Sequence, residues 1–179
     1  MINVRTAFFS DRVHVQHENL YFTELSNIAY LKKTKQSSDE PLVTGKGGSF
    51  AVDGNRDGDF AHGSCTHTGV TKEGESPSWW RVDFGREAKV QSVQISNRVD
   101  CCSQRLGKFD ILVGSSEVNN GTSNSVCQSS LSMTDIAMKK FECQKATVGR
   151  YLYIHSKLTD ALTLCEVEVF GVLLPVGVC

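Results

Sequence analysis

The chain has 179 residues, of which 40% are hydrophobic and 22% charged, which is enough apolar material for the core of one domain of ordinary size. Its formal net charge is −1, with 19 basic and 20 acidic residues, so no overall field attracts nucleic acid or an anionic membrane. No segment approaches the roughly 18 consecutive apolar residues of a membrane span, and we expect neither nucleic-acid binding nor membrane insertion.

Seven cysteines in a chain of this length indicate an oxidising compartment, in which disulfides persist. The sequon Asn120-Gly121-Thr122 fits the same compartment. We therefore expect a secreted protein, although the first residues lack the apolar core of about 7 to 15 residues that marks a secretory signal. The odd number of cysteines leaves one thiol over, and we expect it to be Cys179, either free or joining two chains.

Short segments in which apolar and polar residues alternate predict β-strands along most of the chain. In one of them, "FDILVG", Phe109, Ile111 and Val113 fall on one face. The expected strands, in chain order, are 81–85, 89–96, 109–114, 151–156 and 165–171.

Turn-forming residues are concentrated between these strands, and no long segment shows a helical period. The turn-rich runs are 45–48, 52–59, 72–78 and 115–125. Antiparallel strands with one apolar face must cover that face, and a second sheet does so most economically. The pattern therefore predicts an all-β sandwich.

The loop 53–64 begins like an EF-hand calcium loop, with Asp53 and Asn55 at the first two ligand positions. The last ligand position holds Ser64 where an EF-hand has a bidentate Glu, and no helices are expected on either side. Two interpretations stay open. The loop is either a calcium site of another type, completed by a distant carboxylate such as Glu166, or a solvated Asx turn.

Three potential zinc ligands, His62, Cys65 and His67, follow closely in "HGSCTH". A zinc site normally needs four ligands at characteristic spacings, and no CxxC or HExxH motif completes the set. In an oxidised chain we expect Cys65 to form a disulfide instead.

Two adjacent cysteines, Cys101 and Cys102, stand among charges in "NRVDCCSQR". Neighbouring Cα atoms are about 3.8 Å apart across a trans peptide, whereas a relaxed disulfide has roughly 4.4 to 6.8 Å between them. A bridge between these two residues would be strained, so the residues alone favour pairing elsewhere or free thiols.

The flanking residues Arg98 and Arg105 present planar forks of donors, which Asp100 is available to orient. Such forks suit a carboxylate, a phosphate or the paired hydroxyls of a sugar. They are equally compatible with surface salt bridges of little energetic value. The residue types do not decide between these interpretations.

Five stretches taken together closely resemble the F-type lectin (fucolectin) family over about residues 26–171. They are "FAVDGNRDGDFAHGSCTHT", "SWWRVDFG", "ISNRVDCCSQRLGKFDILVG", "GRYLYIHS" and "LTLCEVEVFG". The sugar-binding pattern of the family, a His followed at a distance by R-x-D-x4-R/K, is matched by His67 and then Arg98, Asp100 and Arg105. The likeness implies a discoidin-like jelly-roll β-sandwich of two antiparallel sheets.

The resemblance also divides the chain. It implies an F-type lectin domain at 26–172, preceded by an N-terminal extension of unknown role at 1–25 and followed by a C-terminal tail with Cys179 at 173–179. The interval between His67 and Arg98 is longer than is usual in the family, and the surplus falls in "GVTKEGESPS".

By the same likeness, His67, Arg98 and Arg105 would hydrogen-bond the hydroxyls and ring oxygen of fucose, beside Asp100. The adjacent Cys101 and Cys102 would be bonded to each other, forming a rigid apolar plate against one edge of the sugar ring. The methyl group of the sugar would lie near an apolar pocket to which Phe60 contributes.

The family also has a structural calcium site, which the resemblance places on the loop already described. The implied ligands are the side chains of Asp53, Asn55, Ser64 and Glu166 and backbone oxygens near Phe50 and Cys165. The implied disulfides are Cys65–Cys165, Cys101–Cys102 and Cys127–Cys143.

The resemblance implies a secreted, calcium-containing, non-catalytic lectin that recognises terminal L-fucose on glycans, in innate immunity or cell-surface glycan recognition. Because a single small sugar gives weak binding, we expect a homo-oligomer, for which a trimer has precedent in the family. Two alternatives remain. One is a discoidin-like module for membrane lipid or a protein partner, and the other is an enzyme with a reactive thiol at Cys101 or Cys102 beside His67.

Overall fold

The computed structural model describes residues 25–39 and 47–175, which form nine strands and four short 3₁₀ helices. The strands are β1 (Ser26–Asn27), β2 (Lys33–Gln36), β3 (Thr66–His67), β4 (Trp79–Ser96), β5 (Phe109–Gly114), β6 (Ser125–Leu131), β7 (Met138–Ser156), β8 (Thr163–Leu164) and β9 (Glu166–Leu173). The helices are η1 (Gly47–Val52), η2 (Phe60–His62), η3 (Ser103–Leu106) and η4 (Val118–Gly121). Residues 1–24 and Cys179 lie outside the described part. Within that part, no helix has the length and apolar character needed to cross a bilayer.

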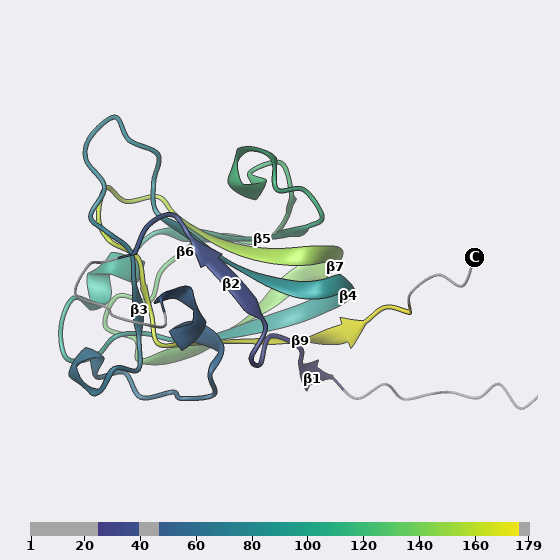
Figure 1. Ribbon diagram of the computed structural model, residues 1–179, viewed down its shortest axis with the longest axis horizontal. Helices are drawn as coiled ribbons and strands as arrows, with labels where there is room; N and C mark the ends of the chain where they lie inside the picture. Colours follow the sequence, from purple (N-terminus) through teal and green to yellow (C-terminus); the bar gives the residue numbers. More distant parts are fainter. Residues whose placement is uncertain (1–24, 40–46, 176–179) are drawn as a thin grey trace, which may run out of the picture.

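Two long antiparallel strands, β4 and β7, run through the whole molecule (Figure 1). Their pairing is irregular between Asp83 and Ala88, and the neighbours of β4 change there. The part of β4 before the irregularity pairs with β2, and the part after it pairs with β9. The expected strands 81–85 and 89–96 are therefore parts of one strand, because the chain bends without leaving the sheet.

The bend produces the two layers of a β-sandwich. One layer contains β2, the start of β4, the end of β7, β5 and β6, and the other contains β1, β9, the end of β4 and the start of β7. The all-β sandwich expected from the sequence is confirmed. Its layers belong to one continuous seven-stranded sheet, since both long strands take part in each layer.

The core lies between the layers and contains apolar side chains from both. Val82 and Ile154 of the first layer and Val93 and Val167 of the second all belong to one buried cluster. Trp80 is also buried there, and its indole N–H donates to the carbonyl of Gly48 in η1 at 2.8 Å. This bond satisfies the one polar group that the indole carries into the core.

Strand β5 has the bounds expected from the sequence, and all three residues of its apolar face are in the core. Strand β9 also lies close to the expected 165–171. By contrast, the first half of β7, in "MKKFECQKATVG", was not predicted. Most of its side chains are exposed, so the alternation that identifies a half-buried strand is weak.

A second, two-stranded sheet of β3 and β8 closes one end of the sandwich. The disulfide between Cys65 and Cys165 joins the residues beside these two strands. The backbone N–H of Cys165 also donates to the carbonyl of Ser96 at the end of β4. Segments far apart in the sequence are thereby held together at this end.

The close approach of β5 and β7 requires glycine at Gly149, which lies against Gly114 at the end of β5. A Cβ added to Gly149 would overlap the backbone of Gly114. We expect Gly149→Ala to lower the free energy of unfolding by about 1 to 3 kcal/mol, measured by urea denaturation, because the strands must separate. The neighbouring Val148→Ala, at an exposed position, is the control and should change it by about 0.5 kcal/mol at most. An equal effect of both variants would contradict the close packing.

Candidate functional site

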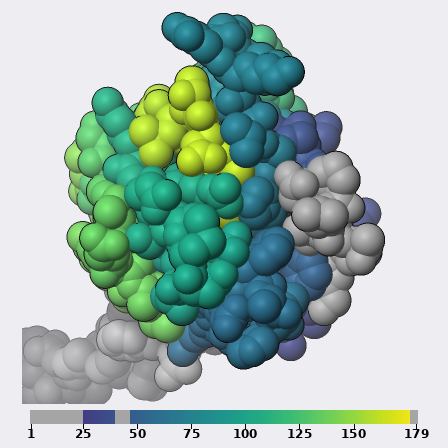
Figure 2. Space-filling view, turned by 90° about the vertical axis from the view of Figure 1, so that its left-hand side faces the viewer, coloured from purple at the N-terminus to yellow at the C-terminus, as the bar shows by residue number. Residues whose placement is uncertain are grey.

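The candidate site is at the end of the sandwich that the β3–β8 sheet closes. The loop before β3, the loop after β4 and the loop after β7 meet on this face, shown in Figure 2. His67 belongs to β3, Arg98 and Asp100 follow β4, and Arg105 belongs to η3. Residues separated by up to about forty positions in the sequence are therefore in contact.

His67 is buried, and both of its ring nitrogens have partners. Nε2 is 2.7 Å from Nη1 of Arg105, and Nδ1 is 2.6 Å from the carbonyl oxygen of Thr68. Arg can only donate, so Nε2 accepts and the proton of the neutral ring is on Nδ1, where it is donated to Thr68. The site therefore contains an imidazole of fixed tautomer and orientation.

Arg98 and Asp100 form a two-pronged ion pair. Nε of Arg98 donates to Oδ1 of Asp100 at 2.8 Å, and Nη2 donates to Oδ2 at 2.7 Å. The backbone N–H of Phe60 also donates to Oδ1 at 3.2 Å. The bond from Arg98 is the main reason that the pKa of Asp100 falls from 3.8 to about 2.

The ring of Phe60 contacts both the guanidinium of Arg98 and the imidazole of His67. The guanidinium of Arg98 is 4.3 Å from the centroid of the ring, and the ring meets His67 edge-on at 5.5 Å between centroids. Phe60 begins η2, which Asp59 caps by accepting from the N–H of Ala61. The loop before β3 thus contributes an aromatic surface to the site.

Cys101 and Cys102 are bonded to each other, at the turn between Asp100 and η3. Cys102 has a left-handed φ of 62° and directly precedes η3. Arg105 belongs to this helix. The other pairs are Cys65–Cys165 and Cys127–Cys143, so these are the three pairings that the family resemblance implied. While the adjacent cysteines are bridged, neither is a thiolate nucleophile.

One residue of the site was missed in the sequence. Asp160, in the loop after β7, has Oδ1 3.4 Å from Nε of Arg105. No sequence pattern links these two residues, which only the fold brings together. Each arginine of the site therefore has a carboxylate beside it.

The charges and donors of the site favour a neutral ligand with several hydroxyls. Arg98 and Arg105 are each offset by a nearby carboxylate, so little net positive charge remains for a phosphate. Each guanidinium has five N–H donors, and only some of them are used within the protein. Remaining donors beside an aromatic ring and a disulfide can bind hydroxyls on one side of a ligand and apolar groups on another.

The loop 53–64 is a chain of Asx turns in which side-chain oxygens accept from the backbone two residues later. Asp53 accepts from Asn55, and Asn55 accepts from Asp57. Glu166 is buried and accepts from the N–H of Gly54, with 3.3 Å and 3.2 Å from the nitrogen to its two oxygens. Burial is the main reason that the pKa of Glu166 rises to about 8.

The other implied calcium ligands lie on the same part of the structure. Ser64 is buried and its hydroxyl donates to the carbonyl of Asp59 at 2.8 Å, while Phe50 is in η1. Among the described residues, no three His, Cys, Asp or Glu side chains gather around a possible metal position. The implied set combines the two carboxylates of Asp53 and Glu166 with amide, hydroxyl and carbonyl oxygens, all of which calcium accepts.

The zinc interpretation of "HGSCTH" is not supported by the structure. Cys65 is in a disulfide, and both nitrogens of His67 have partners within the site. His62 is exposed, and its Nδ1 is 2.7 Å from Oδ2 of Asp57. The three residues therefore have separate structural uses.

Comparison with known proteins identifies the class. Residues 50–154 match the family model described as "NedA-like, galactose-binding domain". Fucolectin-1 of Anguilla japonica is 43% identical over 165 residues, which is 89% of this chain and 86% of that protein. The chain belongs to the fucolectin, or F-type lectin, family.

Solved structures agree with this assignment. A fucolectin from the serum of Morone saxatilis, the striped bass, has a TM-score of 0.76 and 35% identity, over 86% of this chain and 51% of that one. This chain thus spans about half of the striped bass protein. A fucose binding module of Streptococcus pneumoniae has a TM-score of 0.67 and 37% identity, over 80% of this chain and 94% of that one.

The ion pair predicts how Asp100 titrates. We expect its pKa to be about 2 in the wild type and close to 3.8 in Arg98→Ala, because the bond from Arg98 favours the carboxylate. The pair should contribute stability above pH 3.8 and lose it as the pH falls toward 2. NMR titration of the side-chain carboxyl carbons measures both values.

Asp83 is the matched control for this titration. It receives the same two bonds from Arg150, and its pKa is lowered by them. Arg98→Ala should leave the pKa of Asp83 unchanged. An ordinary pKa of Asp100 in the wild type would contradict the geometry of the pair.

Proposed function

We propose that this protein is a non-catalytic lectin that binds terminal L-fucose on glycans. The observation that carries the proposal is the bond between Arg105 and the neutral His67, next to the Arg98–Asp100 pair. The names of its relatives support the same ligand, since they are fucolectins and a fucose binding module. The residues that match the sugar-binding pattern of the family are in contact with one another or with Phe60.

Each part of the site has a role in this proposal. Free N–H groups of Arg98 and Arg105 donate to the hydroxyls and ring oxygen of fucose, while His67 accepts from Arg105 and holds that side chain in place. Each charge-assisted bond contributes about 1.5 to 3 kcal/mol. The methyl group of fucose packs toward Phe60, and the bridge between Cys101 and Cys102 covers one edge of the sugar ring.

Arg98→Ala should abolish measurable binding of L-fucose. Loss of even one charge-assisted bond weakens binding roughly tenfold to a hundredfold, which is decisive for a site of millimolar to micromolar affinity. Calorimetric titration of L-fucose measures the effect, with D-galactose as the control ligand. Arg150→Ala is the control variant, because it removes an equally paired arginine at an exposed position outside the site.

A negative result with the wild type would reject the proposal. If the disulfide-intact, calcium-supplied protein bound neither fucose nor a fucosylated oligosaccharide, the scaffold would be present without its sugar site. Binding of membrane lipid or of a protein partner would then be the function to test.

We also propose that the loop 53–64 and Glu166 hold a structural calcium ion. The buried Glu166 supports this, because a carboxylate out of water needs a cation or a proton. Asp53, Asn55 and Ser64 would supply further oxygens, with backbone oxygens near Phe50 and Cys165. The ion would tie the loop that carries Phe60 to β9, beside the Cys65–Cys165 disulfide.

Calcium should stabilise the wild type and have much less effect on Glu166→Gln. At a hundred times the dissociation constant, a bound ion adds about 2.7 kcal/mol to the free energy of unfolding. Thermal denaturation with calcium and with chelator measures this. Glu168→Gln is the control, because Glu168 is bonded to Arg56 and Gln94 instead. Equal stabilisation of all three proteins would contradict the site.

The remaining proposals concern the setting of the protein. We place it outside the cell, where its disulfides persist, and in innate immunity or cell-surface glycan recognition. A single weak site gains avidity when several copies assemble, so a homo-oligomer such as a trimer suits this use. Light scattering of the purified protein, with and without reductant, tests both the number of chains and a role for Cys179.

A further inference from the structure

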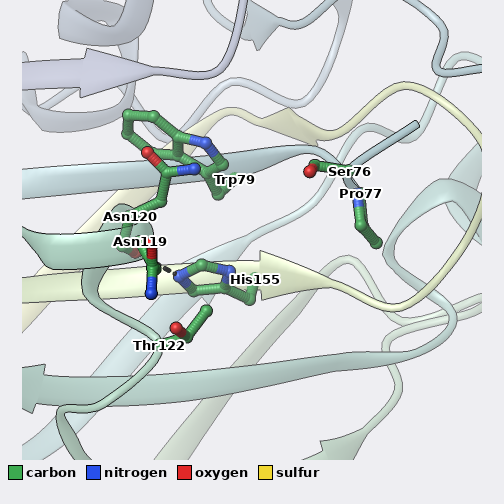
Figure 3. A pocket seen from close by; sticks show the side chains of 7 residues that line it. All are labelled: Ser76, Pro77, Trp79, Asn119, Asn120, Thr122 and His155. Atoms are coloured by element: carbon green, nitrogen blue, oxygen red, sulfur yellow. Dashed lines mark hydrogen bonds between the residues drawn. The ribbon is translucent and has the colours of Figure 1, made fainter.

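A hollow of about 360 Å³ is lined by none of the residues of the proposed fucose site (Figure 3). Trp79 of β4 and His155 of β7 form part of its wall. The turn that contains η4 and the end of the loop before β4 provide the rest. The lining residues are Ser76, Pro77, Trp79, Asn119, Asn120, Thr122 and His155.

The hollow combines an aromatic surface with neutral polar groups. Trp79 packs against Tyr153, with 6.0 Å between the ring centroids. Nε2 of His155 is 2.9 Å from the carbonyl oxygen of Asn120, which fixes this side of the turn to β7 (Figure 3). Aromatic rings with amides, hydroxyls and an uncharged imidazole are suited to a neutral sugar.

The conformation of the turn explains three of its residues. Asn119, Asn120 and Gly121 have left-handed φ values of 49°, 55° and 74°. Asparagine and glycine tolerate this region, and a Cβ at Gly121 would overlap the ring of Tyr153. The turn therefore requires Asn or Gly at these positions whether or not they bind anything.

The same reasoning does not explain Thr122. It is exposed, and its hydroxyl has no protein partner among the described residues. The amide of Asn120 is likewise exposed and has no such partner. Together with Gly121 these residues form an Asn-x-Thr sequon, whose two essential side chains are both accessible beside the hollow.

We propose that Asn120 carries an N-linked glycan whose innermost N-acetylglucosamine lies in this hollow against Trp79. In the transfer, Nδ2 of Asn120 forms a bond to the anomeric carbon of a lipid-pyrophosphate-linked oligosaccharide. The bond from that carbon to the pyrophosphate oxygen breaks, Nδ2 loses a proton, and the lipid pyrophosphate leaves. The modification requires the same secretory route as the disulfides and is independent of fucose binding.

Mass spectrometry of the full chain secreted from animal cells tests the modification. We expect Asn120 to be occupied, occupancy to be lost in Thr122→Ala, and Asn119→Gly, which the left-handed turn tolerates, to keep it. Asn119 is the matched control, because it lines the same hollow but is not part of the sequon. An unmodified Asn120 in the secreted wild type overturns the proposal.

A second experiment tests the position of the sugar. An endoglycosidase that leaves one N-acetylglucosamine gives a form to compare with Thr122→Ala, which has none. We expect the single sugar to raise the melting temperature by about 2 to 4 °C, the shift that a contact of ordinary strength gives a chain of this length. The difference should disappear when both forms also carry Trp79→Leu.

If Trp79→Leu does not fold, the position of the sugar can be measured directly by NMR on the wild-type protein. In the wild-type form with one sugar, we expect nuclear Overhauser contacts between the acetyl methyl group and the indole of Trp79. Their absence, together with an unchanged melting temperature, overturns the placement in the hollow. Fucose binding by Thr122→Ala should equal that of the wild type, so the outcome is separable from the proposed lectin function.

Discussion

Strands β4 and β7 are hydrogen-bonded to each other along nearly their whole length, and the rest of the structure depends on the bend in this pair. In a flat antiparallel pair, the end of β4 and the end of β7 would lie at opposite ends. The bend folds one half of the pair over the other, so both strand ends come to the same end of the sandwich. The contact between Arg105, after β4, and Asp160, after β7, exists for this reason.

Ion pairs within the site join these loops. Each of the two arginines has a carboxylate beside it, so little net charge remains. Asp100 holds Arg98 and accepts from the backbone of Phe60, so one carboxylate connects the loop after β4 to the loop before β3. A second backbone bond, from the N–H of Val99 to the carbonyl of Gly58, reinforces this connection. Because the donors are fixed before a ligand arrives, little ordering of the arginines is needed on binding.

The loop before β3 has few apolar contacts of its own, and its order depends on attachments at both ends. One attachment is the Cys65–Cys165 disulfide, which joins two residues that are 100 positions apart in the sequence. The other is the buried Glu166, which meets the N–H of Gly54. The proposed calcium ion would act at the second attachment. It would affect fucose binding by fixing the loop and therefore the position of Phe60.

The sequence by itself determined the strands with clear alternation, such as β5, and the all-β class. Through the motif of His67, Arg98, Asp100 and Arg105, it also determined the family. Tertiary structure alone decided that β4 is one bent strand and that the exposed first half of β7 completes the second layer. It also decided the role of Asp160 and the tautomer of His67. These features depend on contacts between residues far apart in the chain, which local alternation and motif spacing do not encode.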